Sequence, residues 1–159
     1  MIQKQTIKKF LDELGSKSPT PGGGAVAAVS GAMAASLVEM VCVLTKNGGL
    51  KNEASKATKI REKLIKLADD DVSAFDGVMK AYRAKNKVQI KKSLKVAMDV
   101  PMKVALLSKD IQKLALIVAK KGNKNAYSDA KSAFHLAKAA EASAMENVKI
   151  NKKALVALG

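Results

Sequence analysis

Apolar residues recur along this chain at the three- and four-residue spacing of amphipathic helices. The pattern predicts five helices, at about residues 2–14, 25–46, 52–83, 88–120 and 128–148, and no strands. Gly15, the Pro- and Gly-rich segment 16–24, Asn47-Gly48-Gly49 and the segment 122–125 separate them, because glycine and proline interrupt helices. Residues 151–159 have the pattern of one more helix that stops early. The short connections predict an all-α, antiparallel helical bundle that forms one domain over residues 1–159.

Two of the predicted helices have an unusual composition. Pro101 lies in the middle of helix 88–120, where we expect it to kink the helix and to free a carbonyl near Ala97. In residues 24–44 the only formal charge is Glu39, and the length approaches that of a membrane span. Small side chains and an acidic group favour a helix packed at the centre of a bundle or across a dimer interface. The narrow Ala-rich stripes predict that a homodimer completes the core.

Charge and composition limit the classes of partner. The net charge of +15 attracts polyanions, but Arg61 and Arg83 are the only arginines and aromatic residues make up only 3%. Arginine and aromatic rings supply most base contacts and stacking, so we expect no nucleic-acid partner. The lysines form either a solvated surface or a field that attracts an anionic substrate. A single cysteine, Cys42, and a charged N-terminus without a signal peptide predict a cytoplasmic protein.

The segment SPTPGGG, residues 18–24, precedes the Ala-rich helix and is the first candidate site. Prolines stiffen this loop, and glycines permit positive φ angles and close approach to a ligand. Free N–H groups and the positive end of the helix dipole then favour an anion or a carbonyl group. A tight, Gly-rich connection between two helices is the alternative.

The segment GNKNAYSDA, residues 122–130, is the second candidate. Asn125 or Ser128 could cap the following helix, and Asp129 suits its first turn. Capping needs only one such residue, so a functional role for the others remains open. The lone His135 has no second histidine or cysteine at ligand spacing, and we expect no metal site.

The third candidate is DDDVSAFD, residues 69–76. Asp69 and Asp70 fit a solvated acidic face. Asp71 lies nearer the apolar stripe, between Ala68 and Phe75. If it is buried, its pKa rises and it can donate or accept a proton.

Five segments, in this order, carry a resemblance that covers essentially the whole chain: SPTPGGG, LADDDVSAFDGVMKAY, AMDVPMKVA, KGNKNAYSDA and ENVKIN. Together they resemble the cyclodeaminase/cyclohydrolase family. The resemblance implies a homodimeric all-α bundle with a cleft for a tetrahydrofolate derivative, which in cells often carries a glutamate tail. It implies either methenyltetrahydrofolate cyclohydrolase, which we favour for a stand-alone chain, or formiminotetrahydrofolate cyclodeaminase, with no cofactor beyond the tetrahydrofolate substrate.

Transferred residue by residue, the resemblance implies Asp129 as the first acid/base candidate and Asp71 as the second. The residues implied to bind the substrate are Ser18, Thr20, Pro21, Gly22, Gly23, Gly24, Asn123, Asn125 and Ser128. The chain departs from the family pattern in a short connection at 45–53, in Lys131, in His135 and in the short C-terminus. A non-catalytic folate binder and a basic helical protein that coats nucleic acid are the two alternative functions.

Overall fold

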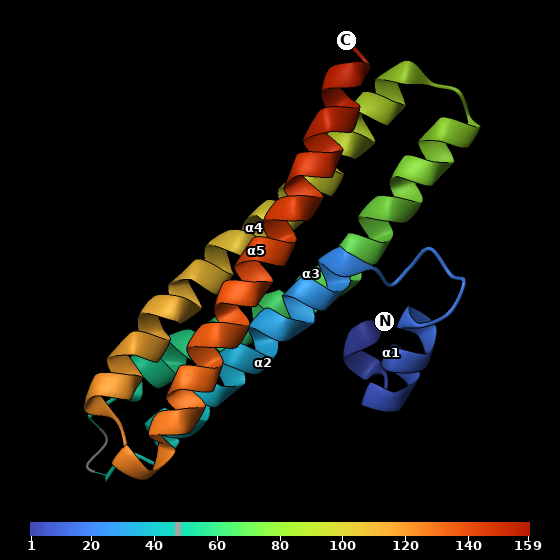
Figure 1. The fold of residues 1–159 in the computed structure, drawn as a ribbon. Coiled ribbons are helices and arrows are strands. Elements are labelled where there is room, and N and C mark those ends of the chain that lie inside the picture. The colour runs from blue at the N-terminus through green and yellow to red at the C-terminus, as the bar shows by residue number, and fades with distance from the viewer. Residues whose placement is uncertain (47–48) are drawn as a thin grey trace.

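The computed structural model describes residues 1–46 and 49–159, and every regular element in that part of the chain is helical, as predicted (Figure 1). The first elements are the short 3-10 helix η1 (Ile2–Lys4) and α1 (Ile7–Leu14). The long helices are α2 (Gly23–Val43), α3 (Lys51–Arg83), α4 (Lys87–Lys121) and α5 (Tyr127–Ala157), and the 3-10 helix η3 (Lys124–Ala126) precedes α5.

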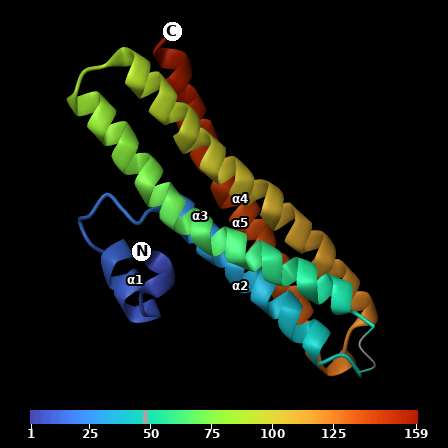
Figure 2. The same cartoon turned by 180° about the vertical axis from the view of Figure 1, so that it is seen from behind.

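The long helices form a bundle in which α2 packs against α3, α4 and α5 (Figures 1 and 2). Helix α2 has 21 residues, whereas α3, α4 and α5 have 33, 35 and 31. The α3–α4 hairpin and the C-terminal part of α5 therefore extend well beyond the point where α2 begins. The bundle has four helices on one side of Gly23 and three on the other, and this change of helix number creates the candidate site described below.

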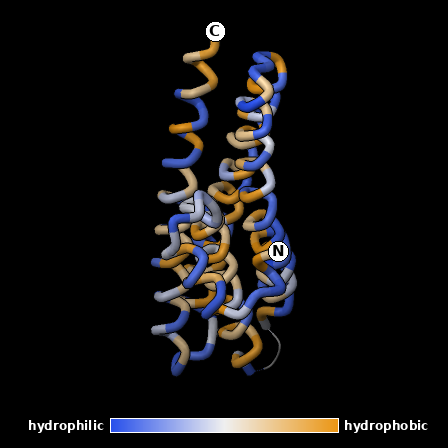
Figure 3. The backbone as a smooth tube through the Cα atoms, turned by 90° about the vertical axis from the view of Figure 1, so that its right-hand side faces the viewer, coloured by the Kyte–Doolittle hydropathy of each residue, from blue (hydrophilic) through white to orange (hydrophobic). Residues whose placement is uncertain are grey.

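Small side chains build most of the core. Apolar and polar positions alternate along the helices (Figure 3), and the buried positions of α2 and α5 are mainly alanines. Alanine has the highest helix propensity and lets helix axes approach closely. Helix α2 is long and apolar enough to cross a membrane by length and composition alone, and half of its most apolar stretch is buried inside the bundle.

The N-terminal prediction of one helix over 2–14 is wrong in detail. The chain forms η1, an extended residue Gln5, and then α1, whose N-cap Thr6 accepts a hydrogen bond from the Lys9 N–H at 3.2 Å. No residue of α1 is buried, and Ile7 and Leu11 are 79% and 55% exposed. The amphipathic pattern is real, but its apolar face is covered only in part: Phe10 and Leu14 are half-buried, whereas Ile7 and Leu11 are exposed.

The predicted end of the last helix is also wrong. Residues 151–159 are not a separate helix, because α5 continues through them to Ala157. Ala154, Leu155 and Leu158 pack against a cluster of Ala81, Ile90 and Leu94 at the tip of the α3–α4 hairpin. The segment that joins the two predicted helices contains no glycine or proline, and packing at its far end stabilises the continuous helix.

The other helix boundaries agree with the predictions to within three residues. Of the break expected at Asn47-Gly48-Gly49, residues 47 and 48 lie outside the described part of the chain. Helix α4 continues through Pro101 as one element. The carbonyl of Ala97, four residues earlier, is free of helical bonding as predicted and accepts a hydrogen bond from Asn151 Nδ2 at 2.9 Å.

Candidate active site

A pocket of about 400 Å³ lies where α2 begins and leaves a space between α3 and α5. The start of α2 forms one end of this pocket, α3 and α5 form its sides, and two residues of α4 form its floor. The lining residues are Pro19, Thr20, Gly22, Gly23, Gly24, Asp71, Ala74, Phe75, Val78, Tyr82, Leu94, Ala97, Asn147, Ile150, Asn151 and Ala154. Apolar walls with a few polar groups at one end are typical of a site for a small organic ligand.

Asp71 lies directly against the first turn of α2. A Cβ atom added to Gly24 would meet the Asp71 Oδ1 at 2.1 Å and its carboxyl carbon at 2.5 Å. Only glycine permits this contact, because any side chain would occupy the place of the carboxylate. The close approach predicted for this loop is therefore found, but not positive φ: the only glycine in the described chain with positive φ is Gly159.

Burial raises the pKa of the Asp71 carboxyl above its ordinary value of 3.8. Removal of the group from water disfavours its charged form, and a hydrogen bond from the Ala25 N–H acts more weakly in the opposite direction. The sequence predicted a raised pKa on the condition that Asp71 is buried, because Asp71 lies near the apolar stripe of α3. A carboxyl group with a raised pKa beside an apolar pocket is a candidate for proton transfer to or from a bound ligand.

The first turn of α2 also provides hydrogen-bond donors. Gly22 is the N-cap, and the first helical bond runs from the Val26 N–H to the Gly22 carbonyl. The N–H groups of Gly23 and Gly24 precede that bond and have no partner among the residues that the structure describes. These donors and the positive end of the helix dipole favour negative charge on a ligand oxygen close to Asp71.

The rest of the predicted loop has different roles. Thr20 lines the pocket, but Ser18 and Pro21 are not among the lining residues. The Ser18 hydroxyl donates to the Thr20 carbonyl at 2.6 Å, and Pro21 is buried after a cis Thr20–Pro21 peptide bond. Ser18 therefore stabilises the loop conformation, whereas Thr20, Gly22, Gly23 and Gly24 face the pocket.

Two asparagines of α5 complete the polar end of the pocket, and neither is among the site residues predicted from the sequence. Asn147 Nδ2 lies 3.4 Å from the position of a Cβ on Gly23 and donates to the Ser143 carbonyl at 3.0 Å. Asn151 follows one turn later and donates to the carbonyls of Ala97 and Asn147. Spacing of i and i+4 on one helix, inside the ENVKIN segment, was the signal that could have identified them.

The cluster around Asp129 lies at the opposite end of the bundle (Figure 1). The 18 residues of α5 between Asp129 and Asn147 correspond to about 27 Å along the helix axis, at about 1.5 Å per residue. Within one chain the structure therefore does not bring Asp129 and Asp71 together.

The side chain of Asn123 and the backbone N–H of Asn125 form hydrogen bonds that stabilise the turn in which they lie. Asn123 Oδ1 accepts from the Asn125 N–H at 3.0 Å, and Asn123 Nδ2 donates to the Leu44 carbonyl at 2.9 Å. The predicted cap, Asn125 or Ser128, is wrong: Asn123 caps η3, and α5 begins after Ala126 without a side-chain cap. The short 3-10 turn moves the capping position upstream. Ser128 is exposed, and Asp129 is half-buried.

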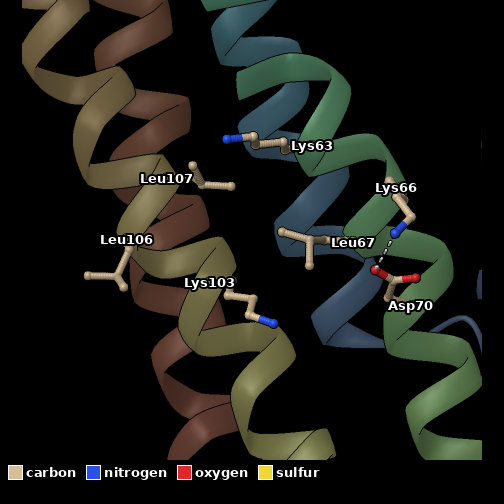
Figure 4. A pocket seen from close by; sticks show the side chains of 7 residues that line it. All are labelled: Lys63, Lys66, Leu67, Asp70, Lys103, Leu106 and Leu107. Carbon is tan, nitrogen blue, oxygen red and sulfur yellow. Dashed lines mark ion pairs between the residues drawn. The ribbon is translucent and has the colours of Figure 1, made fainter. Parts of the chain in front are cut away.

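A second hollow, of about 410 Å³, lies on the seam between α3 and α4 (Figure 4). Lysines and leucines line it, and its one carboxylate, Asp70, pairs with Lys66 at 3.8 Å across exposed side chains. Such an exposed pair contributes little to stability. The carboxylate of this hollow is paired with an exposed lysine, whereas desolvation raises the pKa of Asp71, so the pocket at Asp71 is the better candidate for chemistry.

Three comparisons identify the relatives of this chain. Residues 6–156 match the family described as formiminotransferase-cyclodeaminase. Methenyltetrahydrofolate cyclohydrolase of Methylorubrum extorquens is 42% identical over an alignment of 172 positions, gaps included, which covers 98% of this chain and 83% of that protein. Formimidoyltransferase-cyclodeaminase of Sus scrofa is 32% identical over an alignment of 169 positions, which covers 92% of this chain but only 30% of that longer protein.

The fold has a close counterpart among solved structures. The crystal structure of formiminotetrahydrofolate cyclodeaminase from Thermotoga maritima superposes with a TM-score of 0.91 at 36% sequence identity, over 98% of this chain and 82% of that chain. Sequence and structure thus agree over nearly the whole length and confirm the resemblance carried by the five segments. The chain belongs to the formiminotransferase-cyclodeaminase family.

Proposed function

We propose that the chain is a folate one-carbon enzyme that acts at the methenyl/formyl or formimino group of tetrahydrofolate. Methenyltetrahydrofolate cyclohydrolase is the favoured activity, because the relative of that name is 42% identical and matches nearly full length. Formiminotetrahydrofolate cyclodeaminase is the second activity, supported by the Thermotoga maritima structure. The observation that carries the proposal is the half-buried Asp71 carboxyl, whose pKa is raised by desolvation, at the polar end of an apolar pocket.

Both reactions pass through a tetrahedral carbon between two folate nitrogens. In the hydrolysis, water adds to the methenyl carbon and loses a proton to a base. One carbon–nitrogen bond then breaks, the nitrogen receives a proton, and the formyl group remains. Asp71 is the group we propose to move these protons, and the free N–H groups of Gly23 and Gly24 steady charge on the oxygen. No electrons are transferred, so we expect no cofactor beyond tetrahydrofolate.

Asp129 remains the alternative acid/base residue, as the resemblance implies. It could reach the Asp71 pocket only from a second subunit, since about 27 Å of helix separates it from Asn147 of its own chain. Asp129, Asn123, Asn125 and Ser128 then form either a site of their own or part of a shared one.

The first experiment is optical. Purified protein mixed with methenyltetrahydrofolate is expected to accelerate the decay of the ring's absorbance over the rate in buffer. No acceleration, together with formation of methenyltetrahydrofolate and ammonia from formiminotetrahydrofolate, would establish the cyclodeaminase instead. Saturable tetrahydrofolate binding without either turnover would establish the non-catalytic binder. Tight, strongly salt-dependent binding to random duplex DNA with no folate binding would favour the nucleic-acid alternative.

We also propose a homodimer that covers the outward face of α2. Val29, Met33, Leu37, Met40 and Leu44 share this face, and no charged residue lies among them. Met33, Met40 and Leu44 are 48%, 37% and 49% exposed in the single chain. A contiguous apolar surface on a helix that is half buried elsewhere is typical of a subunit interface.

Replacing Met33 and Met40 together by Glu is expected to produce monomers, because two carboxylates would be buried in the interface. Sedimentation velocity at micromolar concentration measures the change. The control is Leu106→Glu with Leu116→Glu, which introduces the same two charges at residues of α4 that are 59% and 51% exposed. The proposed interface is contradicted if the wild type is a monomer, or if the variant with glutamate at both Met33 and Met40 still forms a dimer.

The glutamate tail and the cytoplasmic location stay predictions. If the lysine field guides a tail, polyglutamylated substrate should bind more tightly than the monoglutamate at low salt, and the difference should shrink as salt increases.

A further inference from the structure

Pro101 creates an unusual hydrogen-bonding requirement in the floor of the active-site pocket. In a regular helix the Ala97 carbonyl would accept from the N–H of residue 101, but proline has no N–H. Both residues are buried in the bundle. A buried carbonyl needs a partner, and the partner is the side chain of Asn151 on α5, whose Nδ2 donates at 2.9 Å.

The same Nδ2 group makes a second hydrogen bond, to the Asn147 carbonyl at 2.9 Å. An amide nitrogen has two hydrogens, so these two carbonyls use its full donor capacity. They also establish which end of the amide is nitrogen, because an oxygen in that position would face two acceptors. The Asn151 amide is therefore held in one orientation, with Oδ1 directed away from both backbone carbonyls.

Asn151 is half-buried and lines the pocket. Its Oδ1 has no donor among the residues that the structure describes. The nearby walls are apolar and include Phe75, Tyr82 and Leu94. A fixed acceptor among such side chains selects a flat ligand with N–H groups on its edge, and it disfavours a carboxylate.

We infer that Asn151 Oδ1 accepts a hydrogen bond from the N–H edge of the substrate's pterin ring, and that Pro101 positions Asn151 by leaving the Ala97 carbonyl to it. This inference rests on the proposed folate function and assigns the orientation of the ligand within the pocket. The pterin carries ring N–H and amino donors, whereas the opposite end of a folate carries carboxylates. The donor-rich end therefore lies on the α4–α5 side, and the one-carbon group faces Asp71.

The test measures binding of tetrahydrofolate, which is not consumed, to four proteins: wild type, Pro101→Ala, Asn151→Ala and the double variant. Asn151→Ala is expected to raise Kd about tenfold or more, as for one lost hydrogen bond in a buried site. Pro101→Ala supplies an N–H to the Ala97 carbonyl and releases the amide, so Kd should rise by a smaller factor. The double variant should bind no more weakly than Asn151→Ala, because Pro101 acts only through Asn151.

The Pro101→Ala background also separates binding from folding. There the Ala97 carbonyl keeps a partner when Asn151 is removed, so the double variant is expected to fold as well as Pro101→Ala, as judged by thermal unfolding. A pterin analogue without the amino group should lose affinity for wild type but not for Asn151→Ala. Equal Kd values for Pro101→Ala and the double variant would overturn the inference. A wild-type protein that neither binds nor turns over folates would overturn the proposed function as well.

Discussion

Asp71→Asn is expected to lower kcat for methenyltetrahydrofolate at least 100-fold while tetrahydrofolate binding changes little. General acid–base groups contribute about 100- to 10,000-fold to rates, and the amide keeps the shape of the carboxyl but cannot accept the proton. Because the pKa of Asp71 is raised by burial, wild-type activity should increase as pH rises through that pKa, above the ordinary value of 3.8. Stopped-flow absorbance across pH measures both effects.

Although Asp71→Asn is expected to lower activity, it is expected to increase the stability of the fold. A carboxyl with a raised folded-state pKa binds its proton more tightly in the folded protein than in the unfolded chain, so ionisation costs folding free energy as pH increases. Asp71→Asn should therefore be more stable than wild type towards urea at pH 7, and the difference should narrow as pH falls towards 3.8.

Asp129→Asn is the comparison variant, because Asp129 is the alternative acid/base residue and lies at the other end of the bundle within one chain. If this variant loses turnover and Asp71→Asn keeps it, the acid/base role belongs to Asp129.

Gly24→Ala is expected to reduce kcat by a similar factor through a different cause. The new methyl group would lie 2.1 Å from Asp71 Oδ1, so the carboxylate must leave its position beside the α2 N-terminus. Its hydrogen bond from the Ala25 N–H and its place in the pocket would both be lost. Steady-state kinetics and thermal unfolding should show a large loss of activity with a smaller change in stability, because the displaced atoms are the end of a side chain.

Gly77→Ala is the control for this substitution. Gly77 lies on α3, the same helix as Asp71, and a Cβ there has no neighbour closer than Ser93 Oγ at 4.0 Å. We expect full activity and a slight gain in stability, since alanine favours the helix by up to about 1 kcal/mol relative to glycine. Full activity in Gly24→Ala would show that Asp71 need not occupy its observed position.

Much of the fold could be predicted from the sequence because each long helix has a sustained apolar period and most are bounded by glycine, proline or asparagine. The free Ala97 carbonyl followed from Pro101 alone, since the missing N–H is a covalent property. Local spacing placed Asp71 near the apolar stripe, between Ala68 and Phe75, and so identified it as the carboxyl whose pKa would rise on burial; the structure supplies that burial. These conclusions depend on residues within a few helical turns of one another.

The tertiary structure alone decided where the candidate residues lie relative to one another. Asp71 and Asn151 are 80 positions apart in the sequence, yet both line one pocket, because α2 is shorter than its neighbours. Asp129 and Asn147 share one helix but lie about 27 Å apart, because each residue adds about 1.5 Å of rise. Periodicity defines the faces of a helix, whereas the relative axial position of packed helices depends on contacts between distant residues.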